Sequence, residues 1–125
     1  MKSVIATKNA PAAIGPYSQG INTGDLLFTS GQIPLIPDGS ELVCGIENQT
    51  RQVMENLKAI LEAGGVGLEN IVKTTIFLTD LKNFSVVNEI YAGYFSNEPP
   101  ARSTIQVAAL PMGAEIEIEA IAKGQ

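Results

Sequence analysis

The 125 residues contain no histidine and no tryptophan, and cysteine occurs once, at Cys44. Without histidine, the chain lacks the Ser–His and Cys–His pairs of nucleophilic hydrolases and the HExxH site of zinc proteases. A single cysteine excludes an internal disulfide bond and the CxxC pairs of redox and zinc sites. Any catalysis must therefore use carboxylates, tyrosine, arginine, lysine, hydroxyl groups and backbone N–H groups.

Cationic residues and long apolar runs are also scarce. Eight lysines and arginines against 13 acidic residues give a net charge of −5. Because an acidic surface repels phosphate backbones, we do not expect nucleic acid as the primary partner. No run approaches the ~18 apolar residues of a membrane span, and the N-terminal segment lacks the apolar region of a secretory signal. These absences predict a protein of the reducing cytoplasm with no membrane partner, and Cys44 is more simply explained as a free thiol than as a nucleophile.

The length suits one domain, residues 1–125, with a hydrophobic core of its own. β-branched runs indicate strands, and apolar residues at i, i+4, i+7 and i+8 indicate helices. Gly24-Asp25 has the spacing of a two-residue hairpin turn, Gly64-Gly65 is a helix stop, and Asn83 can cap the second helix. Strands are expected at residues 4–7, 19–23, 26–30, 71–79, 102–107 and 115–122, and helices at 47–63 and 84–95.

Two amphipathic helices on one face of a mixed sheet make an α+β fold. The second helix should bury an apolar stripe made of Phe84, Val87, Tyr91 and Phe95. The strand at 71–79, IVKTTIFLT, is apolar or β-branched at nearly every position, so both of its faces should be buried. Because two helices cover only one face of the sheet, we expect another subunit to cover the other face.

The last strand, AEIEIEAIA, carries the best candidates for acid–base chemistry. Glu115, Glu117 and Glu119 project to one face, because side chains alternate along a strand. Three neighbouring carboxylates repel one another, which is typical of a solvated outer face. The alternative is that the middle one, Glu117, is partly enclosed and acts as a general acid–base group.

Arg102, one of only two arginines, begins the β-branched run RSTIQV. It could pair with a glutamate on a neighbouring strand, or its planar guanidinium could hold a small carboxylate through two parallel hydrogen bonds. Tyr17 lies in the segment IGPYSQG, whose stiff backbone suits either loop packing or the positioning of the tyrosine hydroxyl. Gly31 could offer an unpaired backbone N–H to an oxyanion.

Together these segments resemble the RidA/YjgF family of reactive intermediate deaminases, in order and spacing and almost from end to end. Six blocks in register are highly specific for the family, and less so for one subgroup. The matching blocks are APAAIGPYSQG (10–20), SGQIP (30–34), VKTTIFLTDL (72–81), VNEIYAGYF (87–95), PPARSTIQVAALP (99–111) and IEIEAIA (116–122).

The resemblance implies a chorismate-mutase-like fold, with two helices on one face of a mixed sheet, and a homotrimer with clefts between its subunits. It also implies hydrolysis of 2-enamine and 2-imine acids, such as 2-aminoacrylate, 2-iminopropanoate and 2-iminobutanoate, to 2-oxo acids and ammonia. The resemblance implies that neither a metal nor an organic cofactor takes part.

Residue roles also follow from the resemblance. Arg102 would bind the substrate carboxylate, Glu117 would position the attacking water, and Tyr17 would complete the catalytic group. Asn88 is the asparagine that the family carries in its second helix.

Three further residues are expected to bind substrate. Ser30 and Gly31 line the cleft in the family. Many members have cysteine where this chain has Thr104, whose backbone N–H could still bind a carboxylate, and this difference leaves the substrate preference open.

Two other functions remain as alternatives. A non-catalytic module that binds small carboxylates, with a translation-inhibitor or chaperone-like role, would use Arg102 equally well but would gain little from Glu117. Nuclease action on RNA is the third reading, and the negative net charge and the missing histidine argue against it.

Overall fold

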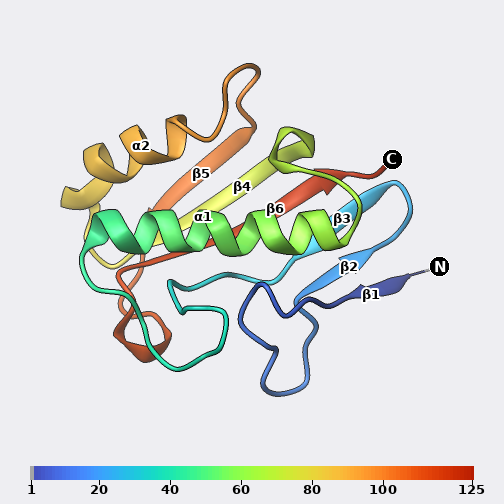
Figure 1. The fold of residues 1–125 in the computed structure, drawn as a ribbon. Coiled ribbons are helices and arrows are strands. Elements are labelled where there is room, and N and C mark those ends of the chain that lie inside the picture. Colours follow the sequence, from blue (N-terminus) through green and yellow to red (C-terminus); the bar gives the residue numbers. More distant parts are fainter. Residues whose placement is uncertain (1) are drawn as a thin grey trace.

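The computed structural model describes residues 2–125, so Met1, the first residue of the expected domain, lies outside it (Figure 1). The strands and helices follow one another in the expected order. The strands are β1 (Ser3–Ile5), β2 (Gly20–Asn22), β3 (Leu26–Thr29), β4 (Ile71–Leu78), β5 (Ala101–Gln106) and β6 (Ile116–Lys123). The helices are α1 (Ile46–Ala63) and α2 (Phe84–Ala92), with short 3-10 turns η1 (Leu68–Asn70), η2 (Leu81–Asn83) and η3 (Pro111–Gly113).

The strands form a mixed sheet in the order β1-β2-β3-β6-β4-β5. Its neighbouring strands are antiparallel except for β4 and β5, which run parallel. The connection between β4 and β5 contains α2, because parallel neighbours need a crossover. Both helices lie on the same face of the sheet (Figure 1), which confirms the α+β fold. None of the helices within residues 2–125 has the length and apolar character needed to span a bilayer.

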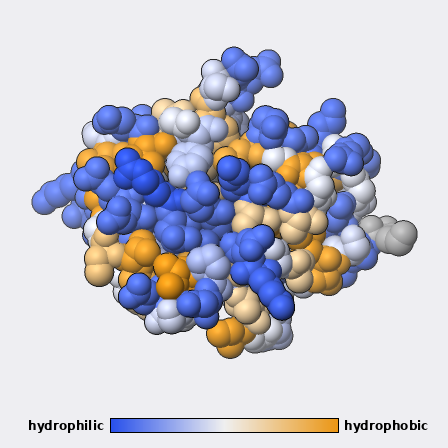
Figure 2. All heavy atoms as spheres, in the orientation of Figure 1, coloured by the Kyte–Doolittle hydropathy of each residue, from blue (hydrophilic) through white to orange (hydrophobic). Residues whose placement is uncertain are grey.

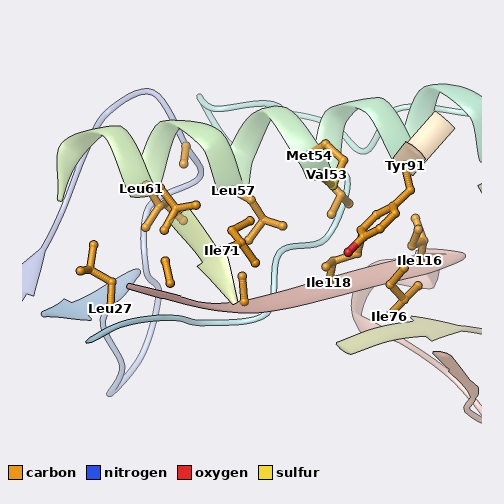
Figure 3. Packing of buried hydrophobic residues seen from close by; sticks show 14 of the residues in the cluster. Leu27, Val53, Met54, Leu57, Leu61, Ile71, Ile76, Tyr91, Ile116 and Ile118 are labelled. Atoms are coloured by element: carbon orange, nitrogen blue, oxygen red, sulfur yellow. The ribbon is translucent and has the colours of Figure 1, made fainter. Parts of the chain in front are cut away.

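The main core lies between α1 and the middle of the sheet (Figure 3). The apolar stripe of α1 meets isoleucines of β4 and β6, and these side chains are almost completely shielded from solvent. Burying a side chain of this size contributes ~1.5–3 kcal/mol, so this layer holds the two central strands firmly in place. Its members include Val53, Met54, Leu57, Leu61, Ile76, Ile116 and Ile118.

Glycines end α1 and turn the β2–β3 hairpin at the expected positions. After α1, Gly65 has a φ of +87°, and the N–H of Val66 donates to the carbonyl of Leu61 at 3.0 Å, as in a Schellman motif. In the hairpin, Gly24 has a φ of +98° at the first position of the two-residue turn, a conformation that favours glycine.

The expected start of α2 at Phe84 is confirmed, whereas its cap and its end differ from the expectation. The helix ends at Ala92, just before Gly93, and does not continue to residue 95. Asn83 makes no side-chain cap, because the preceding turn η2 is capped by Asp80 and runs directly into α2. Phe84, expected in the buried stripe, is 38% exposed. It lies in the first turn of α2 beside β5, an edge strand that has no neighbour beyond it.

The sheet face opposite the helices is not covered by any element of residues 2–125. Phe28 on β3 and Ile105 on β5 are 40% and 44% exposed there. The helix side, which Figure 2 shows, carries mainly hydrophilic side chains across its middle. Within one chain, only the helix side of residues 71–79 is fully covered, as expected for two helices on one face. Burial of the other face by a second subunit stays a prediction.

Candidate functional site

Arg102 lies at the start of the edge strand β5 and directs its side chain to the helix side of the sheet. Its Nη1 donates a hydrogen bond to Asn88 Oδ1 on α2 at 2.7 Å. The guanidinium carbon is 5.5 Å from the centre of the Phe84 ring and 5.2 Å from that of Tyr91. Within residues 2–125, the guanidinium thus meets a neutral amide and two aromatic rings and not a glutamate on a neighbouring strand. We call Arg102, Asn88, Phe84 and Tyr91 the arginine cluster.

The free edge of β5 adds backbone donors to the arginine cluster. The N–H of Val107 donates to the carbonyl of Leu78 on β4 at 2.8 Å. Because backbone groups alternate in direction along a strand, the N–H groups of Arg102 and Thr104 point away from β4, toward the free edge. Next to Arg102, a hollow of about 400 Å³ opens between α2 and Pro100. This edge combines a permanent positive charge with N–H groups that have no neighbouring strand within residues 2–125, which suits a small carboxylate.

The hydroxyl of Thr104 is shielded from solvent, and it has no hydrogen-bond partner within residues 2–125. We expect Thr104→Val to raise the free energy of unfolding by about 1 kcal/mol, because a shielded hydroxyl without a partner costs stability. Thr74→Val is the matched control: the Thr74 hydroxyl bonds the Tyr91 hydroxyl at 2.7 Å, so its removal should destabilise the fold. Denaturant unfolding of both variants measures the difference. Destabilisation by Thr104→Val would mean that this hydroxyl finds a partner in solution.

A second group of predicted residues surrounds Glu117 on β6. Gln32 forms an isolated bridge with Ile118, through backbone hydrogen bonds of 2.8 and 3.1 Å, and this bridge places Gly31 beside the strand. A Cβ atom at Gly31 would overlap the carboxylate of Glu117, so any larger residue there would displace the glutamate side chain. Ser30 Oγ donates to the carbonyl of Ser18 at 2.6 Å. We call Glu117, Gly31 and Ser30 the glutamate cluster.

Tyr17 lies in the loop between β1 and β2, next to Ser18. The hydrogen bond from Ser30 to Ser18 attaches this loop to the glutamate cluster. The phenol is 53% exposed. Its backbone N–H donates to the carbonyl of Gly15 at 2.9 Å, in a tight turn where Gly15 has a φ of +113°. The loop presents the phenol to solvent and does not pack it into the core.

The carboxyl group of Glu117 is half-buried, whereas that of its neighbour Glu119 is exposed. Burial raises the pKa of Glu117 above the ordinary value of 4.5, and the negative charge of Glu119 raises it further. A raised pKa brings a carboxylate closer to the range in which it exchanges protons at neutral pH. This environment matches the enclosed acid–base group more closely than a fully solvated face.

One chain does not bring the two clusters together. Arg102 lies on the helix side of β5, at one edge of the sheet. Glu117 projects to the opposite face, because its neighbours Ile116 and Ile118 point into the core. Tyr17 belongs to the loop between β1 and β2, the strands at the other edge.

Sequence reasoning assigned Phe84 and Tyr91 to the core alone and missed their contact with Arg102. The available signal was their spacing, since residues seven apart lie on the same face of a helix. Arg102 is the strand neighbour of Thr74, whose hydroxyl bonds that of Tyr91, so the arginine lies on the same side of the sheet as the two rings. The sequence pattern does not contain that register.

Comparison with known proteins gives consistent matches along the chain. The sequence model of the family described as endoribonuclease L-PSP matches residues 7–123. The putative reactive intermediate deaminase TdcF of Escherichia coli K12 is 46% identical over 125 residues, covering 98% of this chain and 97% of that protein. The chloroplastic Reactive Intermediate Deaminase A of Arabidopsis thaliana is 54% identical over 122 residues, covering 97% of this chain and 65% of that protein.

Solved structures agree with these matches. The crystal structure of E. coli TdcF with bound serine superposes with a TM-score of 0.95 at 44% identity, covering 98% of this chain and 99% of the other. The expected fold is therefore confirmed as that of RidA and YjgF structures. The chain belongs to the RidA/YjgF family, the endoribonuclease L-PSP family of sequence models, in which several relatives are named reactive intermediate deaminases.

Proposed function

We propose that the protein hydrolyses reactive 2-enamine and 2-imine acids, such as 2-aminoacrylate, 2-iminopropanoate and 2-iminobutanoate, to 2-oxo acids and ammonia. The observation that carries this proposal is the environment of Arg102. Its side-chain hydrogen-bond partner is the neutral Asn88, and it lies beside the outward-facing N–H of Thr104. A relative crystallised with serine, itself a small carboxylic acid, supports such a ligand.

We further propose that the arginine cluster of one subunit meets the glutamate cluster and Tyr17 of the next, in a homotrimer. The uncovered sheet face, with Phe28 and Ile105 exposed, supports an assembly that buries it. In a ring of identical subunits, one surface of each subunit contacts a different surface of the next. Such a contact would bring the arginine cluster of one subunit opposite the glutamate cluster of its neighbour.

In the proposed reaction, Arg102 holds the carboxylate and so fixes the imine carbon against a waiting water. Glu117 takes a proton from the water as its oxygen bonds to the carbon of the protonated imine, and the C=N electron pair moves to nitrogen to give a neutral amine. Glu117 then returns that proton to the nitrogen, the C–N bond breaks and ammonia leaves, while the hydroxyl proton passes to solvent as the oxygen forms the ketone. Tyr17 donates a hydrogen bond to the tetrahedral centre. An enamine must first gain a proton at Cβ to become the imine.

The direct test couples a serine or threonine dehydratase to the protein and follows release of the 2-oxo acid. We expect release to become faster in proportion to the amount of protein added, above the rate of unaided hydrolysis. The non-catalytic alternative predicts 2-oxo acid binding with no acceleration. The family model's endoribonuclease description is not a second candidate here, because the net charge of −5 disfavours RNA.

Mixed assemblies test the sharing of the site between subunits. Arg102→Ala and Glu117→Gln subunits, each inactive alone, should regain activity when they are unfolded and refolded together. In an equal, random mixture, about a quarter of the interfaces carry an intact Arg102 opposite an intact Glu117. The dehydratase-coupled assay should therefore recover about a quarter of wild-type activity, and no recovery would place the whole site within one chain.

A further inference from the structure

We infer that Phe84 and Tyr91 are positioning residues, whose rings hold the guanidinium of Arg102 between them in a fixed plane for the substrate carboxylate. This inference deepens the proposed function and rests on it. Phe84 and Tyr91 are seven residues apart on α2, so their Cα atoms are about 10 Å apart along the helix axis. The guanidinium carbon lies over both rings, 5.5 and 5.2 Å from their centres, which suits a cation held between them.

The geometry explains why rings are useful at this position. An aromatic ring attracts a cation to its face, whereas the N–H donors of a guanidinium lie in its plane and point outward from its edges. Rings on either side therefore restrain the group without occupying the donors that a carboxylate needs. Asn88 takes one bond from Nη1. An arginine held in this way loses less conformational freedom when it binds its ligand.

Tyr91 is fixed independently of the arginine. It is 4% exposed, and its hydroxyl bonds that of Thr74, two atoms shielded from solvent at 2.7 Å. Figure 3 shows its ring extending from α2 with the hydroxyl toward the sheet. It also packs against Phe95, with ring centres 4.9 Å apart. One wall of the arginine site is therefore rigid.

Phe84 is the informative ring, because core packing does not account for it. It is 38% exposed, at the first turn of a helix whose other stripe residues, Val87 and Tyr91, are buried. The contact of its ring with the guanidinium of Arg102 gives this exposed phenylalanine a role. Removing a half-exposed ring leaves the core intact, so Phe84 can be changed without unfolding the chain.

The test uses Phe84→Leu, which keeps apolar bulk and removes the ring. The probe is 2-oxobutanoate, titrated by calorimetry, together with steady-state hydrolysis of 2-iminobutanoate. We expect Kd and KM to rise about three- to tenfold, with kcat changed less than about twofold, because the lost interaction serves binding in the ground and transition states alike. Phe84→Tyr should restore both constants. The matched control is Tyr94→Leu, which removes a ring whose hydroxyl donates to the carboxylate of Glu55. It should leave Kd and KM unchanged.

Nuclear magnetic resonance gives a readout that does not require turnover. The chain has two arginines, so Arg51→Lys assigns the Nε–H signal of Arg102. Stacked rings should shift this signal upfield, and Phe84→Leu should reduce the shift. Tyr91→Phe keeps its ring and should retain the shift, while loss of the hydrogen bond to Thr74 lowers thermal stability.

The outcomes separate this inference from the proposed function. Wild-type protein that accelerates no imine hydrolysis, while the ring shift is present, would remove the proposed function and leave the aromatic positioning in place. An active wild type in which Phe84→Leu changes neither Kd nor the Arg102 signal would overturn the inference alone. Equal effects of Tyr94→Leu and Phe84→Leu would also overturn it, because they would indicate general loosening around α2.

Discussion

Arg102→Ala should reduce imine hydrolysis to the unaided rate while the protein keeps its fold. A hydrogen bond to a charged group contributes ~1.5–3 kcal/mol, so losing two parallel bonds to the carboxylate lowers kcat/KM by about 10²–10⁴-fold. The fold should survive because Arg102 is only half-buried and its side-chain hydrogen bond to Asn88 lies at the edge of the sheet. The dehydratase-coupled assay and circular dichroism measure the two effects.

Two further variants sharpen this experiment. Arg102→Lys keeps the charge but not the planar fork, so it should lose most of the activity as well. Arg51→Ala removes the other arginine, on the exposed side of α1, and should have little effect. Full activity in Arg102→Ala would remove the basis of the proposed function.

Glu117→Gln should lower kcat by about 10²–10⁴-fold, the usual contribution of a positioned acid–base group. The amide keeps the shape of the side chain beside Gly31 but cannot accept a proton. Binding of 2-oxobutanoate should change little, because Arg102 supplies most of it. Calorimetry measures the binding of 2-oxobutanoate, and steady-state kinetics measures kcat. An equal loss of binding and turnover would assign Glu117 to binding only.

The pH dependence of the wild type should report the same carboxyl group. The proposed base is the ionised form, and its pKa is raised by burial and by Glu119. Activity should therefore fall as the pH decreases through that raised pKa, at a higher pH than an ordinary glutamate would give. Glu119→Gln, at an exposed neighbour, should move this fall to lower pH without abolishing activity. A profile that does not move would show that the limiting ionisation belongs to another group.

Stability should change in the opposite sense. A carboxyl group whose pKa is raised in the folded state binds more protons there than in the unfolded chain, so its contribution to stability is lost as the pH rises through the raised pKa. Glu117→Gln removes this cost and should be more stable than the wild type at neutral pH. The gain should vanish below the ordinary pKa of 4.5. Thermal melting at several pH values checks the sign and also shows that the inactive variant is folded.

Local patterns in the sequence predicted most of the fold. The stripe of α1 and the β-branched run of β4 follow from periodicity, and Gly24 and Gly65 take the backbone conformations that their turns require. The start of α2 at Phe84 also followed, but its Asn83 cap and its end did not, because the preceding turn is capped by Asp80 and the helix stops at Ala92, before Gly93. The order of the strands in the sheet could not be predicted from local patterns either, because tertiary packing decides which strands pair.

The candidate site was predicted as a set of residues and not as an arrangement. Glu117 and Gly31 are in contact as two candidates of one cleft should be, and Asn88 bonds Arg102. The separation of Arg102 from Tyr17 follows from the strand order, which places β5 and the β1–β2 pair at opposite edges. No residue pattern along the chain indicates that Arg102 and Tyr17 lie at opposite edges of the sheet. Nor does it indicate how a second subunit would bring such residues together.

The crossover from β4 to β5 has a consequence for folding. Asn88 and Arg102 are 14 positions apart, so the arginine cluster is a local unit of one helix, one connection and one strand. Gly31 and Glu117, in contrast, come from the two halves of the chain and meet only when the hairpin and the last strand have docked. Closing a short loop costs less entropy, and local contacts form sooner than distant ones. During refolding, capture of a 2-oxo acid should consequently return earlier than turnover.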